Sequence, residues 1–507
     1  MGFEPEDVAL DASPFIVLGD SESSHETACW RPLFRHQCSF NAEVFNDVLV
    51  NLIQNPNINS SWLFRADILY DSVEPLAALA VPEVEHAHIP LFLGFELRRC
   101  IVRRLIPRNT LRDKPMDQTC LIYRTASYQE DDAVTAVEKT LVVYLPHIST
   151  PSEMPFYHPV VRGIAFLHEW TAAAESRGSI SISYLFFSEE DRSSVRLVRT
   201  ALRLLEVIHK HGKGRLEGYQ KRVHHDRLVP QARVQNTYTR LKQKYARSLI
   251  KSWAETTDPA KHVFEDLCIA AFLLELWLDT YGQGTFPGFV DIGCGNGLLV
   301  YILNQEGFAG WGFDARSRKS WAAYNTKMKT PAGEQDTLQQ LVLLPPPVSR
   351  DGLAGLSGDT FNDKLIHNGR FPEGTFIISN HADELTPWTP IIAALSECPF
   401  IAIPCCSHNL AGERFRAPAP KDKTTADSAY SSLVVWVSNI ATDCGWEVEQ
   451  EMLRIPSTRN TALVGRKRST QSPTLDIQAI VDKYGGTAGY LESVVKLVTS
   501  TASASEH

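Results

Sequence analysis

The chain has 507 residues, of which 44% are hydrophobic, and its 50 Lys and Arg against 59 Asp and Glu give a formal net charge of −9 at pH 7. This length and composition predict about two to four domains with packed cores and exclude a disordered chain. The negative charge also excludes binding of a polyanion by overall charge, so a nucleic acid would have to be bound by local basic patches.

The cysteines and the apolar segments indicate a cellular location. Ten cysteines are scattered along the chain and form no C-x-x-C pair, which is typical of a reducing compartment. The acidic first 15 residues lack the cationic and apolar regions of a signal peptide. The most apolar helical segment, 263–278, contains Glu265, Asp266 and Glu275, which favours a core helix over a membrane span. We therefore expect a cytoplasmic protein without membrane attachment.

Residues 1–190 are predicted to form a mixed α/β region without an assigned role. Short strand-like runs lie at 121–126, 140–145 and 179–187, and an apolar helix is expected at 44–53. Between Glu96 and Arg112 the chain carries six arginines and no acid. A solvated helix face and a surface that contacts phosphates are the two interpretations of that segment.

Residues 191–257 are predicted to form a basic helical segment. Nine Lys or Arg residues between positions 219 and 251 face a single acid, Asp226. Four of the basic residues would share one helix face: Arg240, Lys244, Arg247 and Lys251. Leu241, Tyr245 and Leu249 would lie on an adjoining face. The segment is either a surface that follows an RNA backbone or a merely solvated helix.

A catalytic domain is predicted over residues 258–468, with a helix that begins at Asp258 and Pro259, typical N-cap and first-turn residues. A strand at 289–292 follows that helix and contains Asp291. Then come glycines at alternate positions: Gly293, Gly295 and Gly297. Glycine lets the backbone adopt a positive φ and lets a ligand lie against the main chain at the start of the next helix.

Asp314 ends the next apolar run, about 20 residues downstream, where nucleotide-binding α/β folds hold a ribose by its hydroxyls. The D-x-G-x-G-x-G spacing from Asp291 to Gly297 is typical of class I S-adenosylmethionine (SAM) methyltransferases and differs from the dinucleotide motif G-x-G-x-x-G. A glycine turn without a ligand and a NAD-type site are the alternatives.

Two further strands are predicted at 375–379 and 400–403, and polar residues follow each of them. His381 and Asp383 come after the first strand, and Cys405, Cys406 and His408 after the second. Because the carboxyl ends of parallel strands meet at one edge of a sheet, both groups are expected beside Asp291 and Asp314.

The rest of the chain is predicted to contain a third strand at 340–344, a mobile loop at 409–429, a helix at 433–440, and a strand pair at 446–453 and 461–465. Residues 469–507 are expected to form a C-terminal helix, at 474–498, and a tail.

Six segments together are similar to the tRNA (uracil-2′-O-)-methyltransferase family, which methylates the ribose of uridine 44 in serine tRNAs. They are residues 221–230, 257–277, 289–321, 379–388, 404–406 and 454–460. The resemblance implies a class I methyltransferase fold with a mostly parallel sheet, SAM as the cofactor, tRNA as the substrate and no metal. A helper protein is compatible with this assignment.

The motifs described above, together with the resemblance, predict roles for particular residues. Those expected to bind SAM are Asp291, Gly293, Gly295, Gly297 and Asp314. The available bases are Asp383 and His381, whereas the lysine-aspartate-lysine-glutamate set of many ribose 2′-O-methyltransferases cannot be placed. The residues expected to bind tRNA are Arg240, Lys244, Arg247, Arg454 and Arg459.

Three alternatives to ribose methylation remain open at this point. A C5-pyrimidine methyltransferase would use Cys405 or Cys406 as a nucleophile. A zinc site could instead be formed by Cys405, Cys406, His408 and His381, although adjacent cysteines are an awkward pair for one tetrahedral ion. The third alternative is an RNA-binding subunit without turnover.

Overall fold

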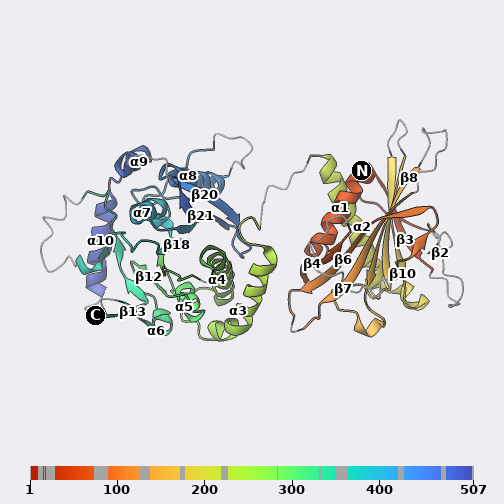
Figure 1. Cartoon of the computed structure of the whole chain (residues 1–507), viewed down its shortest axis with the longest axis horizontal. Helices are drawn as coiled ribbons and strands as arrows, with labels where there is room; N and C mark the ends of the chain where they lie inside the picture. The colour runs from red at the N-terminus through yellow and green to blue at the C-terminus, as the bar shows by residue number, and fades with distance from the viewer. Residues whose placement is uncertain are drawn as a thin grey trace. The chain divides into compact units, whose positions relative to one another are not determined.

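The computed structural model describes residues 2–8, 15, 17–18, 29–72, 89–110, 112–125, 137–171, 177–218, 226–282, 284–330, 333–349, 363–420, 428–469 and 475–504. The chain forms two compact units, residues 1–221 and 222–507 (Figure 1). Each unit has its own sheet and its own hydrophobic core.

Unit 1 is built on an eight-stranded antiparallel sheet with the order β1-β3-β10-β9-β8-β7-β6-β4. The strands are β1 Glu6–Asp7, β3 Arg31–Cys38, β4 Leu63–Asp71, β6 Phe95–Pro107, β7 Met116–Thr125, β8 Val137–Pro146, β9 Gly163–Thr171 and β10 Arg177–Leu185. A small second sheet pairs β2 Val17–Leu18 with β5 Leu91–Phe92. The helices are α1 Ala42–Gln54 and α2 Val195–Leu216, with 3₁₀ turns η1 Pro56–Ile58, η2 Pro151–Glu153 and η3 Glu189–Ser193.

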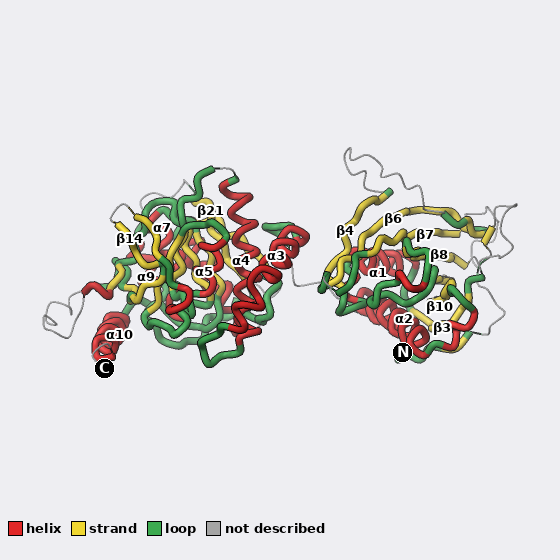
Figure 2. The backbone as a smooth tube through the Cα atoms, turned by 90° about the horizontal axis from the view of Figure 1, so that it is seen from below, coloured by secondary structure: helices red, strands yellow, loops and turns green. Residues whose placement is uncertain are grey.

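Alternation along the strands of unit 1 gives the sheet two apolar faces. Ile122 and Val142 belong to the core that α1 and α2 cover, whereas Leu121 and Val143 pack with Trp30 on the opposite face. Both helices lie over the same face of the sheet (Figure 2). The predicted strands at 121–126, 140–145 and 179–187 and the helix at 44–53 are confirmed, with two exceptions. Residue 126 lies outside the described residues, and the strand predicted at 179–187 ends at Leu185.

The arginine-rich segment after Glu96 is a strand, β6, and the expectation of a helix face is wrong. Arg99 donates to both carboxylate oxygens of Asp71 (2.9 and 2.5 Å), and Arg104 donates to both oxygens of Asp117 (2.7 and 2.8 Å). Acids on the two neighbouring strands therefore neutralise Arg99 and Arg104. The local sequence around the arginines does not reveal this pairing, because the acids lie elsewhere in the chain.

Residues 191–257, predicted as one basic helical segment, are divided between the units. Helix α2 packs on β3, β10 and α1 of unit 1. Helix α3, Gln231–Lys251, packs on α4, Pro259–Tyr281, of unit 2 through Leu241, Tyr245 and Leu249. Residues 219–225, which carry part of the basic segment, lie outside the described residues.

Unit 2 is built on a seven-stranded sheet with the order β15-β12-β11-β18-β19-β21-β20. The strands are β11 Phe289–Ile292, β12 Gly310–Asp314, β15 Leu338–Gln340, β18 Phe376–Asn380, β19 Phe400–Ile403, β20 Trp446–Met452 and β21 Thr461–Arg468. The first five strands in this order are parallel, and β21 runs antiparallel to both of its neighbours. The mostly parallel sheet is as expected.

Helices cover both faces of this sheet. Phe376 and Ile378 of β18 pack with α3, α4 and α5 Leu298–Gln305, whereas Ile377 between them packs on the other face. The helices of that second face are α7 Thr389–Ser396, α8 Ala429–Asp443, α9 Ile477–Lys483 and α10 Tyr490–Ala504 (Figure 1). Smaller elements are α6 Trp321–Tyr324, β13 Lys327–Thr330, β14 Gly333–Asp336, β16 Val342–Leu343, β17 Ile366–His367, η5 Asp363–Leu365 and η6 Asp383–Leu385.

The chain leaves β11 for β12 on one side and returns to β18 on the other, so the strand order reverses at β11. Such a reversal opens a crevice at the carboxyl ends of the strands, where ligands bind in open α/β sheets. That edge is where the sequence placed its candidate residues.

The ends of the helices follow the local sequence. Asp258 caps α4 by accepting from the Ala260 amide (2.9 Å), as predicted. The single helix expected at 474–498 is two helices, because Gly485, Gly486 and Gly489 between α9 and α10 all have a positive φ. Within the described residues no helix combines the length and the apolar character needed to cross a membrane.

Candidate functional site

The turn between β11 and α5 has the backbone shape that its glycines predict. The φ angles of Gly293, Gly295 and Gly297 are +73°, +52° and +75°, a region that residues with a side chain rarely adopt. A Cβ on Gly297 would lie 2.5 Å from Leu338, and one on Gly293 would lie 3.0 Å from Ala382. A Cβ on Gly295 would meet nothing within 4 Å. Gly293 and Gly297 therefore serve packing, whereas Gly295 borders open space.

Two cavities flank this turn. One, of about 440 Å³, is bordered by α4 and is called here the α4 cavity. The other, of about 450 Å³, is bordered by the end of β12 and by α10 and is called the α10 cavity. Four residues belong to the walls of both cavities: Gly293, Gly295, Arg318 and His381. A ligand lying across Gly295 would thus reach into both.

Asp314 lies at the end of β12 in the wall of the α10 cavity. Its carboxylate accepts hydrogen bonds from the amides of Gly295 and Arg316, each at 3.1 Å. These bonds fix the carboxylate beside the glycine turn. Apolar side chains from Leu341, Val342 and Val494 lie in the same wall, which suits a ribose with a flat ring attached.

The α4 cavity is lined by a cluster of buried acids. Asp291, Asp266 and Glu265 are 2%, 9% and 8% exposed, and Asp291 Oδ1 has no hydrogen-bond partner among the described residues. Burial, reinforced by the charge of Asp266, raises the pKa of Asp291 well above its usual range. Burial together with Glu265 raises the pKa of Asp266 to about 8. A cationic ligand group in this cavity would offset the charge repulsion within the cluster.

The acids and Gly295 together fit the methionine end of SAM, which carries an ammonium group and a sulfonium. The orphaned Oδ1 of Asp291 is a free acceptor, and the open space at Gly295 is the close approach that the cofactor needs. The Asp314 carboxylate is an acceptor that ribose hydroxyls of such a ligand could use.

His381 and Asp383 follow β18 in a strained backbone. Their φ angles are +53° and +43°, which is uncommon without glycine and is concentrated at functional sites. His381 Nε2 lies 3.2 Å from Glu265 Oε1, whereas His381 Nδ1 is buried and has no partner among the described residues. The Glu265 carboxylate therefore orients the ring and leaves one nitrogen directed at no protein group.

Glu265 was missed by the sequence analysis, which used the acids of α4 only to exclude a membrane span. A signal was present, because buried acids in an otherwise apolar helix are costly unless they have a partner or a function. Its partner, His381, lies 116 residues further along the chain.

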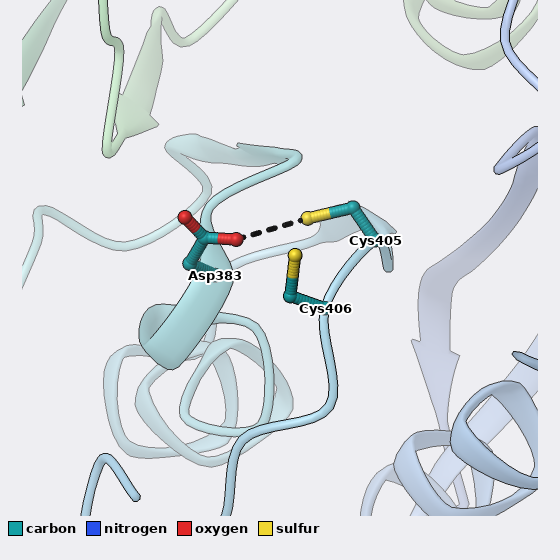
Figure 3. A group of neighbouring side chains, drawn as sticks. All are labelled: Asp383, Cys405 and Cys406. Atoms are coloured by element: carbon teal, nitrogen blue, oxygen red, sulfur yellow. Dashed lines mark hydrogen bonds between the residues drawn. The ribbon is translucent and has the colours of Figure 1, made fainter. Parts of the chain in front are cut away.

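Asp383, Cys405 and Cys406 form a cluster at the same edge of the sheet (Figure 3). The Cys405 thiol donates to Asp383 Oδ1 at 3.2 Å, and the ligand atoms of all three residues lie within 4.8 Å of one another. His381 and His408, which the zinc alternative required, are not part of this group. Burial and the neighbouring Asp383 raise the pKa of both thiols, so they remain protonated at neutral pH and are poor nucleophiles.

The five residues expected to bind tRNA do not form one continuous site. Arg459 borders the α4 cavity and donates to the carbonyl of Cys405 (2.7 Å). Arg454 pairs with Asp226 at 2.5 Å, away from the lining of both cavities. On α3, Arg240 and Lys244 both bind Glu306, and Arg247 is exposed.

Comparisons with known proteins show to which family the chain is similar. A family model described as "Predicted AdoMet-dependent methyltransferase" matches residues 228–337, and one described as "TRM44-like, N-terminal bet v1-like domain" matches residues 9–222. A Neurospora crassa protein named tRNA (uracil-O(2)-)-methyltransferase is 65% identical and covers 98% of each chain. Proteins of the same name are 40% identical in Schizosaccharomyces pombe, over 97% of each chain, and 35% identical in Saccharomyces cerevisiae, over 92% of this chain and 93% of that protein.

Proposed function

Because the chain belongs to the tRNA (uracil-O(2)-)-methyltransferase family, we propose that unit 2 transfers the methyl group of SAM to the ribose 2′-oxygen of a uridine in tRNA. SAM is the cofactor. The finer parts of the proposal are a class I methyltransferase fold, uridine 44 of a serine tRNA as the target, and a cytoplasmic location. The strand order that reverses at β11 and the single antiparallel strand β21 support the class I assignment.

One observation carries the proposal: His381 lies in the wall of both cavities, beside the open face of Gly295. The cofactor would lie across Gly295, with its ribose at Asp314 and its methionine end at Asp291. The reacting oxygen would then lie beside His381, at the edge of the sheet where both strained residues are found. Cofactor and acceptor oxygen would thus meet at a residue that can accept a proton.

The protein contributes positioning and a base. When bound, SAM supplies an electrophilic methyl group on its sulfonium. His381 Nε2–H donates a hydrogen bond to the Glu265 carboxylate, so Nδ1 holds the lone pair that can take the proton of the ribose hydroxyl. The ribose oxygen would take the methyl group from the sulfonium, which would leave as a neutral thioether, and the hydroxyl proton would move to Nδ1. Glu265 then stabilises the imidazolium. Asp383 is the second candidate base.

The activity test is methyl transfer from labelled SAM to uridine-containing tRNA, followed by mapping of the modified nucleotide. We expect label on the 2′-oxygen of one uridine, which makes the adjacent phosphodiester resistant to alkali. The matched control is the same tRNA with 2′-deoxyuridine at that position, which should accept no label. Label on the uracil ring of this control would contradict the proposal.

The α3 surface is proposed to contact the tRNA backbone. Replacing Arg240, Lys244 and Arg247 with Gln should weaken tRNA binding and flatten the slope of log K against log salt by about 0.7 to 0.9 per lost phosphate contact. Arg240 and Lys244 already pair with Glu306. The change in slope therefore measures how far tRNA phosphates replace Glu306 as the partner of these two residues.

A matched control for the α3 variant removes three equally exposed cations from unit 1. Arg35, Arg98 and Arg104 are 52%, 50% and 48% exposed and ion-paired, like Arg240 and Lys244 at 52% and 53%. If the slope of log K against log salt changes equally in both triple variants, tRNA binding depends only on net charge. The surface of α3 would then be a solvated helix face that does not contact tRNA.

A further inference from the structure

Unit 1 contains a cavity of about 620 Å³ between its sheet and the first half of α2. Its size is that of a small-molecule site. Four arginines border it, Arg103, Arg196, Arg199 and Arg203, and no Asp or Glu of the described residues does. In a chain of net charge −9, a cavity wall with this composition is unusual.

Arg103 is the innermost of these cations, at 4% exposed, and a network of neutral groups holds it. Its Nε and Nη2 donate to Gln118 Oε1 (3.0 and 2.6 Å), and Nη1 donates to the carbonyl of Ile53 (2.5 Å) and, more weakly, to that of Leu52 (3.2 Å). One N–H of Nη2 remains unused by these bonds.

The network continues through His158. The Nδ1 of His158 donates to the carbonyl of Pro159 (2.8 Å), so its Nε2 accepts from Gln118 Nε2 (2.9 Å). Burial, with a smaller contribution from the charge of Arg103, lowers the pKa of His158 to about 4. His158 is therefore neutral at pH 7, and the network holds one positive charge.

No negative charge in the described part of unit 1 pairs with that guanidinium. It forms no ion pair there, unlike Arg99 and Arg104 on the same strand, and its other contact is the ring of Tyr144, 5.0 Å away. A buried charge without a counter-charge is costly, and an aromatic face offsets only part of that cost.

Two polar atoms of the cavity residues are likewise unpaired. The hydroxyl of Tyr144, a residue only 4% exposed, and the Oδ1 of Asn59 are buried and have no partner among the described residues. Buried polar groups are normally hydrogen-bonded, so each unpaired atom needs a partner that the described residues do not provide. Tyr144 can donate to an anion, and Asn59 can accept from a ligand N–H or O–H.

We propose that this cavity binds a small organic anion. Its acidic group would lie beside Arg103 and Tyr144, and its apolar body would lie against Leu63, Leu105 and Ile164. The exposed arginines of α2 stand at the cavity wall and attract anions toward it. A free small molecule fits better than an RNA backbone, because the charge that lacks a partner is buried at the inner wall, whereas backbone phosphates are bound on open basic surfaces.

The proposal is tested with two fluorescent probes that share their rings and differ in charge. They are 1-anilinonaphthalene-8-sulfonate, an anion, and N-phenyl-1-naphthylamine, which is neutral. Titrations use the full chain with saturating S-adenosylhomocysteine, so that the site in unit 2 is filled. The anion should bind at least about tenfold more tightly than the neutral probe, and Arg103→Met should remove this preference.

Two further variants keep the test valid if Arg103→Met fails to fold. Tyr144→Phe removes a hydroxyl that has no partner in the described part of the chain and should weaken only the anionic probe, by about three- to tenfold. Arg98→Met, on the same strand but at the exposed surface, should change neither probe. Equal affinity for both probes in the unchanged protein, or an unchanged preference in Tyr144→Phe, would overturn the proposal. Displacement of the anionic probe by tRNA, with no displacement by small carboxylates and phosphates, would also overturn it.

Discussion

Replacing Gly295 with valine is expected to weaken SAM binding by at least about 100-fold, which corresponds to about 2.7 kcal/mol. A Cβ at this position would meet no described atom within 4 Å, so the valine side chain would extend into the space that both cavities share. The cofactor then cannot approach the main chain. Calorimetric titration of SAM into the folded variant measures the loss.

The variant also carries backbone strain, because its φ of +52° disfavours a branched side chain by about 1 to 2 kcal/mol. Gly307→Val is the matched control, since Gly307 has a φ of +90°, a Cβ there would meet nothing within 4 Å, and the residue borders neither cavity. Without ligand, the melting temperature should fall by a similar amount in both variants. The affinity for SAM should fall only in Gly295→Val. If Gly295→Val binds SAM with undiminished affinity, the proposal that SAM binds at this turn is rejected.

The second large effect is on turnover. Asp383→Asn and His381→Asn are each expected to reduce kcat at least about 10²-fold while SAM binding is retained, as when a positioned base is removed. Asparagine is the appropriate replacement, because it tolerates the left-handed backbone that both positions adopt. Comparing the two variants shows which residue takes the ribose proton. Single-turnover methylation of tRNA measures the chemical step.

Replacing Cys405 and Cys406 together with Ser should leave turnover within about tenfold, a change of at most about 1.4 kcal/mol in the barrier. A serine hydroxyl can still donate to Asp383, so the local structure is kept. Inactive cysteine variants beside an active Asp383→Asn would reject ribose methylation in favour of a C5-pyrimidine mechanism.

The parts of the site that were predictable from sequence depend on local chemistry. The glycine turn needs positive φ angles, and buried strands end in polar residues, so Asp291, Gly295 and Asp314 could be found from spacing alone. His381 and Asp383 followed from the rule that parallel strands end at one edge. Their strained backbone could not be foreseen, since the surrounding fold imposes it.

The remaining features depend on contacts between distant residues. Glu265 contacts His381, 116 residues further along the chain, and Arg103 is buried because Gln118 and two carbonyls of α1 accept its hydrogen bonds. In the sequence, the arginines of β6 resemble one face of a helix. In the structure, acids on the adjacent strands pair with two of them, Arg99 and Arg104. Charge alone does not distinguish a strand from a helix when the partners lie elsewhere in the chain.

The docking of α10 has a thermodynamic consequence for cofactor affinity. Tyr490 and Val494, which are 4% and 2% exposed, belong both to the hydrophobic core and to the wall of the α10 cavity. The apparent affinity for a ligand of that cavity equals the intrinsic affinity multiplied by the fraction of molecules in which the helix is docked. By linkage, a ligand that binds in that cavity stabilises the docked helix by the same coupling free energy. If SAM lies across this cavity as proposed, substitutions on α10 that touch no ligand atom should change the SAM concentration at which the enzyme is half-saturated.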